Sequence, residues 1–115
     1  MINNLKIKKL PFISTKSKTL DLYNKKLTKL DVSKETDLTW LVCFHNQLKE
    51  LNLANNKKLK WLWCDKNQLK ELDLTNNKKL KELSCLNNPN LKIIKISKGQ
   101  KINIEKDNHT LIKEA

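Results

Sequence analysis

The feature that most constrains this chain is a repeat of fixed period. Cys43, Cys64 and Cys85 follow one another at a constant 21-residue interval, and the residues around them recur with the same spacing. In one-letter code the shared frame is LxxLxCxxNxLxxLxL, and its three clear copies begin at Leu38, Leu59 and Leu80. Because self-similarity at a period of about 20–50 residues is the signature of stacked repeats, the chain is predicted to be a solenoid.

Each copy predicts one strand and one opposing segment. The alternation in LxC directs one side chain inward and the next outward, as in a half-buried strand that adds one rung to a parallel sheet. The second half of the copy, with Leu48, Leu51 and Leu53 in the first of them, is expected to supply the opposite wall of the core. Because each turn buries apolar residues only against its neighbours, both ends of such a stack need caps.

The two ends of the chain depart from the frame. We expect a single domain over residues 1–115, with an N-terminal cap at 1–15, repeats at 16–96 and a C-terminal cap at 97–115. The apolar residues expected in the first cap are Leu5, Ile7, Leu10 and Phe12. Those expected in the second are Ile102 and Ile104, which alternate like a last strand, and Leu111 and Ile112, which would close the core.

One asparagine recurs in every copy, three residues after the cysteine. These residues are Asn46, Asn67 and Asn88. A polar side chain fixed in each turn predicts a hydrogen-bonding ladder, whose amides satisfy backbone groups where the chain bends away from the sheet. We expect this ladder to be structural and not a ligand site.

The three cysteines are expected to be buried and free. Equivalent residues on adjacent parallel strands lie about 4.8 Å apart with their Cβ bonds in the same direction, whereas disulfide-bonded Cβ atoms lie about 3.8 Å apart and face each other. A metal needs convergent ligands, which a linear ladder does not offer. We therefore expect small apolar fillers, with no metal site and no cofactor.

This pattern resembles the leucine-rich-repeat family, in the 21-residue form of the cysteine-ladder repeats of internalin-type bacterial proteins, over Leu20 to Ile104. The resemblance implies a β-rich solenoid of about four to five turns with few or no helices, a curved parallel sheet on its concave face, and protein recognition. No apolar run is long enough for a signal-peptide core or a membrane span. If the chain is complete, we expect a cytoplasmic protein without a membrane partner, so the secreted adhesin role of such relatives is not carried over.

The outward positions of the predicted strands can vary without harming the core. They are Thr19, Asp21 and Tyr23, then Trp40, Val42 and Phe44, then Trp61, Trp63 and Asp65, then Glu82, Ser84 and Leu86. This set contains all three tryptophans and no lysine, although lysine fills 24 of the 115 positions. A random sample of surface positions from this chain would be expected to contain lysine, whereas this face contains none.

Large exposed aromatic side chains are enriched at binding hot spots. We therefore expect a protein to bind this face through Tyr23, Trp40, Val42, Phe44, Trp61, Trp63, Asp65, Glu82 and Leu86. Self-association through the same aromatic residues is an alternative. The competing interpretation is that the rings only stack on one another and shield the sheet, since cross-strand aromatic pairs stabilise sheets by themselves.

An alternative site is the set of lysines on the turns and the opposite wall. These lysines form pairs that occupy equivalent positions in successive repeats: Lys49 and Lys70, Lys57 and Lys78, Lys58 and Lys79, and Lys60 and Lys81. In a chain with a formal net charge of +12, such stripes are suited to nucleic acid or an acidic partner. The competing interpretation is a solvated polar shell. The carboxylates of the aromatic face would repel phosphate, so nucleic acid is not expected there.

The sequence offers little for catalysis. A single glycine, Gly99, excludes a phosphate-cradling glycine loop. Asp65 and Glu82 are offset by four residues between neighbouring repeats, or roughly 13 Å, beyond the approximately 5–9.5 Å of paired glycosidase carboxylates. We therefore expect a non-catalytic protein-binding module; one form would be a small inhibitor of a bacterial complex, encoded by a phage or mobile element.

Overall fold

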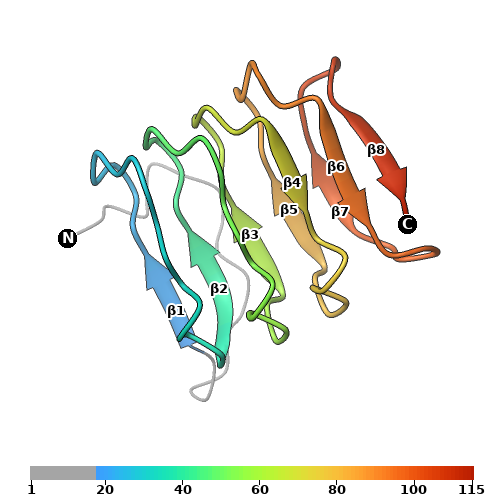
Figure 1. Cartoon of the computed structure of the whole chain (residues 1–115), viewed down its shortest axis with the longest axis horizontal. Helices are drawn as coiled ribbons and strands as arrows, with labels where there is room; N and C mark the ends of the chain where they lie inside the picture. Colours follow the sequence, from blue (N-terminus) through green and yellow to red (C-terminus); the bar gives the residue numbers. More distant parts are fainter. Residues whose placement is uncertain (1–17) are drawn as a thin grey trace.

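A computed structural model describes residues 18–115, which contain eight short strands and no helix (Figure 1). The strands of the first wall are β1 (Lys18–Asp21), β2 (Leu38–Val42), β3 (Trp61–Trp63), β5 (Glu82–Ser84) and β7 (Asn103–Glu105). Those of the second wall are β4 (Glu71–Asp73), β6 (Ile93–Ile96) and β8 (Leu111–Glu114). The chain therefore coils as a solenoid whose turns stack side by side.

The strands pair in two parallel sheets. The first has the order β1-β2-β3-β5-β7 and the second the order β4-β6-β8. In the first sheet Trp40 is in register with Trp61, Trp61 with Glu82, and Glu82 with Asn103, so the 21-residue period sets the strand pairing. The predicted solenoid of about five turns is confirmed, and the opposite wall is itself partly a sheet.

The core lies between the two walls and is built from equivalent residues of successive turns. From the first wall, Leu41, Leu62 and Leu83 point inward and are buried. From the second, Leu72 and Ile94 are fully buried against them. Complete burial of one such side chain stabilises a fold by about 1.5–3 kcal/mol, and each turn contributes several of them.

The predicted asparagine ladder is present and connects each turn to the one before it. The Asn67 amide donates to the carbonyl oxygens of Cys43 and Cys64 at 3.0 and 3.1 Å, while its oxygen accepts from the Leu48 N–H at 3.0 Å. Asn46 and Asn88 repeat this arrangement one turn away on either side. Three buried backbone groups are thus bonded by one side chain.

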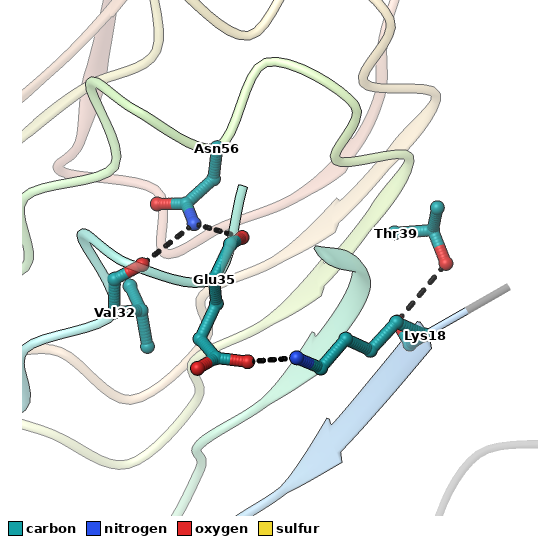
Figure 2. A network of polar contacts seen from close by, with 5 residues as sticks. All are labelled: Lys18, Val32, Glu35, Thr39 and Asn56. Atoms are coloured by element: carbon teal, nitrogen blue, oxygen red, sulfur yellow. Dashed lines mark hydrogen bonds and ion pairs between the residues drawn. The ribbon is translucent and has the colours of Figure 1, made fainter. Parts of the chain in front are cut away.

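A second asparagine ladder, not predicted from the sequence, follows the second wall. The Asn56 amide donates to the carbonyl oxygens of Val32 and Glu35, both at 2.9 Å (Figure 2). Asn77 does the same one turn later, toward Leu53 and Asn56. The Glu35 carboxylate also pairs with Lys18 at the start of β1, so this corner fixes the first described strand to the turn that follows it.

The corner after the first wall places non-glycine residues in the left-handed backbone region. Asn24, His45, Lys66 and Asn87 have φ values of 52, 61, 56 and 61°, and they recur at the 21-residue period. This conformation costs an L-residue about 1–2 kcal/mol, with asparagine among the residues that accept it more readily. The repeat therefore imposes a turn geometry that His45 and Lys66 adopt at a cost.

The C-terminal end differs from its prediction. Residues 97–115 contain β7 and β8, which continue both sheets, and Ile104 points into the core as expected. Leu111 and Ile112 were expected to close the core, but their side chains are 65% and 37% exposed. Leu111 is in register with the outward Glu71 and Ile93, and β8 has a strand neighbour on one side alone. The predicted N-terminal cap lies outside the described residues.

Candidate functional site

The outer side of the five-stranded sheet is the candidate site, which we call the aromatic face. Its strand positions are Thr19, Asp21, Trp40, Val42, Trp61, Trp63, Glu82, Ser84, Asn103 and Glu105. Beyond the strand ends it continues into Tyr23, Phe44, Asp65 and Leu86. The register brings the predicted residues together on one surface, as expected, and adds two polar residues from β7. No lysine occupies any of these positions.

The tryptophan rings of this face pack edge to face. Trp40 meets Trp63 with ring centroids 5.1 Å apart and planes at 83°, and meets Trp61 at 6.3 Å and 69°. The ring centroids of Tyr23 and Phe44 lie 4.7 Å apart, with the two planes tilted by 47°. Edge-to-face pairs place the positive ring edge against the negative face, and each adds about 0.5–1.5 kcal/mol beyond area burial. The rings therefore form one packed layer outside the sheet.

Most of this layer is buried, which corrects the prediction of exposed rings. Trp40, Val42 and Trp63 are only 2–3% exposed and Phe44 is 9% exposed. Tyr23, Trp61, Glu82 and Leu86 keep partial exposure. The alternation of the sequence identifies the side of a sheet on which a residue lies, but not what covers that side. The four buried residues thus act first as packing, as in the shielding interpretation, and the other four remain accessible.

Asp65 is also buried, and its carboxylate has structural partners. The Ser84 hydroxyl donates to it at 2.6 Å and the Leu86 N–H donates at 3.2 Å. Ser84 also lies 3.3 Å from a Glu105 carboxylate oxygen. These bonds join three successive turns on the polar half of the face. One Asp65 carboxylate oxygen, Oδ2, is therefore occupied within the chain, and direct contact of Asp65 with a partner stays a prediction.

Two buried polar atoms near the aromatic rings have no hydrogen-bond partner within residues 18–115. They are Nε1 of Trp40 and one carboxylate oxygen of Asp21. Burial raises the pKa of the Asp21 carboxyl above its ordinary value, because desolvation disfavours the charged form. A buried polar atom left without a partner costs about 1–3 kcal/mol. A group that forms a hydrogen bond with one of these two atoms would therefore remove this cost.

The cysteine ladder lies on the inner side of the first wall. Cys43, Cys64 and Cys85 are fully buried, as predicted for apolar fillers. Burial raises the pKa of the Cys43 thiol to about 12 and that of Cys64 well above its usual range, because a thiolate is poorly solvated in the core. The thiolate is the reactive form, so Cys43 and Cys64 are unsuited to nucleophilic chemistry.

The lysines of the alternative site lie on the turns and the second wall. Apart from the half-buried Lys60, all are exposed, and Lys58 forms an ion pair of 2.9 Å with Asp37. Lys49 and Lys70 line a hollow that also contains Glu50, Glu71 and Asp73. The surface around these lysines is therefore mixed in charge. Lys58 and the two lysines of the hollow lie in solvent and already have acidic neighbours.

Residues 18–115 show no helix that is both long and apolar enough to cross a membrane. In the same range, no three histidine, cysteine or acidic side chains gather as metal ligands would. The strands, the inward cysteines and the asparagines together define the class: a cysteine-ladder solenoid of the leucine-rich-repeat type.

Comparison with known proteins agrees with this class. The chain is similar to the functional domain of InlJ from Listeria monocytogenes, which includes a cysteine ladder, with 27% identical residues and a TM-score of 0.62. The match covers 79% of this chain and 25% of the InlJ chain, so this chain spans about a quarter of that length. No protein-family model and no curated protein matches the chain. The resemblance predicted from the leucine, cysteine and asparagine positions is confirmed.

Proposed function

We propose that this chain is a non-catalytic module that binds a protein through the aromatic face. The observation that supports this most is the composition of that face. It contains all three tryptophans, Asp21, Asp65, Glu82 and Glu105, and no lysine, in a chain with 24 lysines and a net charge of +12. Charged residues of one sign are thus kept away from a single surface, which favours a partner of complementary charge.

The accessible members of the face make the contact, and the buried rings hold them in place. Trp61 is central, since it lies on the middle strand of the sheet and keeps part of its ring in solvent. Tyr23, Glu82 and Leu86 surround it with further partly exposed groups. Packing of Tyr23 and Trp61 against the buried rings lowers the entropic cost of binding, because fewer side chains must be ordered.

The similarity to InlJ supports a protein-recognition fold, but the partner of this chain is our own proposal. An inhibitor of a larger bacterial complex, encoded by a phage or mobile element, is one role that fits a short solenoid with one binding face. The alternative is electrostatic binding of nucleic acid or an acidic protein through the lysine stripe. No residue belongs to both surfaces, so mutations can separate them.

The test is capture of partners from bacterial lysate, after nuclease treatment and at moderate salt. The matched variants are Trp61→Ala and a Lys57, Lys58, Lys78 and Lys79→Gln variant. We expect a protein that the wild type and the lysine variant retain and the Trp61→Ala variant loses. Loss in the lysine variant alone, with binding that weakens steeply as salt rises, would instead assign the function to the stripe.

A further inference from the structure

The edge strands β7 and β8 are neighbours in space and leave apolar side chains in solvent (Figure 1). In the described part of the chain, the exposed large apolar side chains are Leu111 and Ile112, both on β8. Ile112 is in register with the fully buried Ile94, but is itself 37% exposed. Ile104 of β7 is in register with the buried Leu83 and is likewise only half-buried. Among the described residues, the inner side of each wall is therefore uncovered at this edge.

The backbone of the same two strands has hydrogen-bonding groups that point away from both sheets. The N–H groups of Asn103 and Leu111 donate to carbonyl oxygens of the preceding turn, both at 2.9 Å. Because successive residues of a strand alternate in direction, the N–H and C=O groups of Ile104 and Ile112 point to the open edge. No strand within residues 18–115 pairs with that side of β7 or β8. Such an edge is a template for pairing with another chain.

We propose that β7 and β8 are the docking surface for a second copy of this chain, which pairs with them in antiparallel fashion. A two-fold axis that crosses both walls at Ile104 and Ile112 places each of these residues opposite its own counterpart, as a symmetric dimer requires. The N–H and C=O groups of each pair then exchange hydrogen bonds across the axis. Their side chains meet on the inner sides of the walls, so the cores of the two copies become continuous.

The charges of β8 favour this register over the adjacent ones. With Ile112 on the axis, Leu111 lies opposite Lys113 of the second copy, whose aliphatic stem covers apolar surface while the ammonium group stays in water. A shift of two residues in one direction would place Lys113 opposite its own counterpart, and like charges directly opposite each other are destabilising. The opposite shift would pair Lys113 with His109, which lies in a turn outside the strand.

The polar residues near this edge also suit two copies of one surface. On β7 the same axis places Asn103 opposite Glu105 of the second copy, so that an amide donor meets a carboxylate acceptor. Residues 97–115 contain four lysines and three carboxylates, a near balance in a chain of net charge +12. Repulsion between two copies is therefore smaller here than at a lysine-rich surface.

The size of the edge is sufficient for a modest dimer. The turns follow one another along the longest axis of the molecule (Figure 1), and the extents along the other two axes are both 26 Å. A face of these dimensions offers at most about 680 Å² to each copy, or about 1,350 Å² in total, and specific interfaces bury about 1,200–2,000 Å². A dimer with a dissociation constant in the micromolar range fits such an area.

The dimer has a consequence for the aromatic face, although the inference itself does not rest on the proposed function. Because the two first walls join into one sheet, the aromatic faces of both copies lie on the same side. A partner with two binding sites would then contact both faces at once, and its apparent affinity would increase without any new contact.

The test is the mass of the full chain in solution. Sedimentation equilibrium from about 1 μM to 1 mM distinguishes the 13.5 kDa monomer from a particle of twice that mass. Ile112→Glu and Ile112→Lys each place like charges opposite each other on the axis, whereas an equal mixture of the two places opposite charges there. The matched control is Ile93→Glu, because Ile93 lies on the outer side of β6 and β8 separates it from the open edge.

We expect the wild type and Ile93→Glu to associate as the concentration rises. Each Ile112 variant alone should associate at least about a hundredfold more weakly, because like charges at an interface cost several kcal/mol, and the mixture should recover the association. A wild type that stays at the monomer mass throughout would overturn the proposal. So would a mixture that does not associate, or a dimer that survives Ile112→Glu and is lost in Trp61→Ala, since the aromatic face would then be the interface.

A measurement on the wild type decides the case if the substitutions unfold the chain, which alkylation of the three buried cysteines would reveal. Hydrogen exchange at the Ile104 and Ile112 amides should become several times slower as the concentration rises, because these groups point to the second copy. The Asn103 and Leu111 amides are already bonded within the chain and serve as the internal reference. Exchange at Ile104 and Ile112 that is independent of concentration would refute the dimer.

Discussion

The two walls of the solenoid follow the same repeat but present different chemistry to the outside. On the first wall, the outer positions of β2 and β3 are filled by Trp40, Val42, Trp61 and Trp63. On the second wall, the equivalent outer positions of β4 and β6 include Glu71, Asp73 and Lys95, with Lys95 and Glu71 paired at 2.8 Å. Over these strands the first wall therefore presents an aromatic layer and the second wall a solvated charged surface.

The difference shows which part of the sequence the fold does not require. Both walls bury leucine or isoleucine on their inner sides, and both are joined by asparagine ladders. The second wall forms the same kind of sheet with charged residues on its outer side. The aromatic layer is thus additional to the needs of the repeat, which is why we assign function to the first wall.

The largest expected effect separates the two outer sides. Trp63→Ala should lower the free energy of unfolding by about 3–5 kcal/mol, because a buried aromatic side chain is lost from a packed layer. Lys95→Ala should change it little, since its ion pair with Glu71 is exposed and screened by water. Urea unfolding of both variants measures this. Similar losses from the two would mean that the aromatic layer contributes no more than the charged surface.

A smaller effect is expected from substitutions in the two asparagine ladders, which should differ in their loss of stability. Asn67→Ala leaves the Leu48 N–H without a hydrogen-bond partner, while the two carbonyl groups that Asn67 bonds still accept from a neighbouring asparagine of the same ladder. Both carbonyl groups that Asn77 bonds keep a backbone N–H partner. We expect Asn67→Ala to be more destabilising by about 1–3 kcal/mol, the cost of one unsatisfied buried group. Urea unfolding gives the difference, and faster hydrogen exchange at the Leu48 amide would locate it. Equal losses would contradict the assignment.

The smallest effect concerns the corner after the first wall. Lys66→Gly should raise the free energy of unfolding by up to about 1 kcal/mol, because glycine adopts a positive φ without the cost paid by lysine. Lys70→Gly, outside the left-handed region, should instead lower it by about 0.5–1 kcal/mol. Thermal unfolding of the two variants shows whether each substitution raises or lowers the free energy of unfolding. A loss of stability in both would show that the corner geometry is not strained.

The 21-residue period predicts the features that occupy equivalent positions in successive turns. Once Cys43 and Cys64 are aligned, the strand register, the inward leucines and the Asn46 ladder follow without further information, and the structure confirms them. The second ladder escaped the prediction although Asn56 and Asn77 also occupy equivalent positions in successive repeats. Each adjoins another asparagine, and the pattern does not indicate which of the two points inward.

Burial of the candidate site could not be predicted from the same pattern. Alternation places Trp40 and Trp63 on the outer side correctly, but exposure depends on what lies above them.

An extra residue near Pro89 is a second feature that the repeat pattern did not predict. The step from β4 to β6 is one position longer than the repeat, since Glu71 pairs with Ile93. One inserted residue in a corner leaves both inner sides intact, so the core pattern hides it.

The stacking of turns has a mechanical consequence. Each described strand pairs only with strands of adjacent turns, so tension applied to the two ends of the chain meets one interface at a time. Release of one 21-residue turn lengthens the chain by at most about 70–75 Å. The molecule is therefore built to yield in separate steps from its ends. Its middle turns, which pair on both sides, are the last to give way.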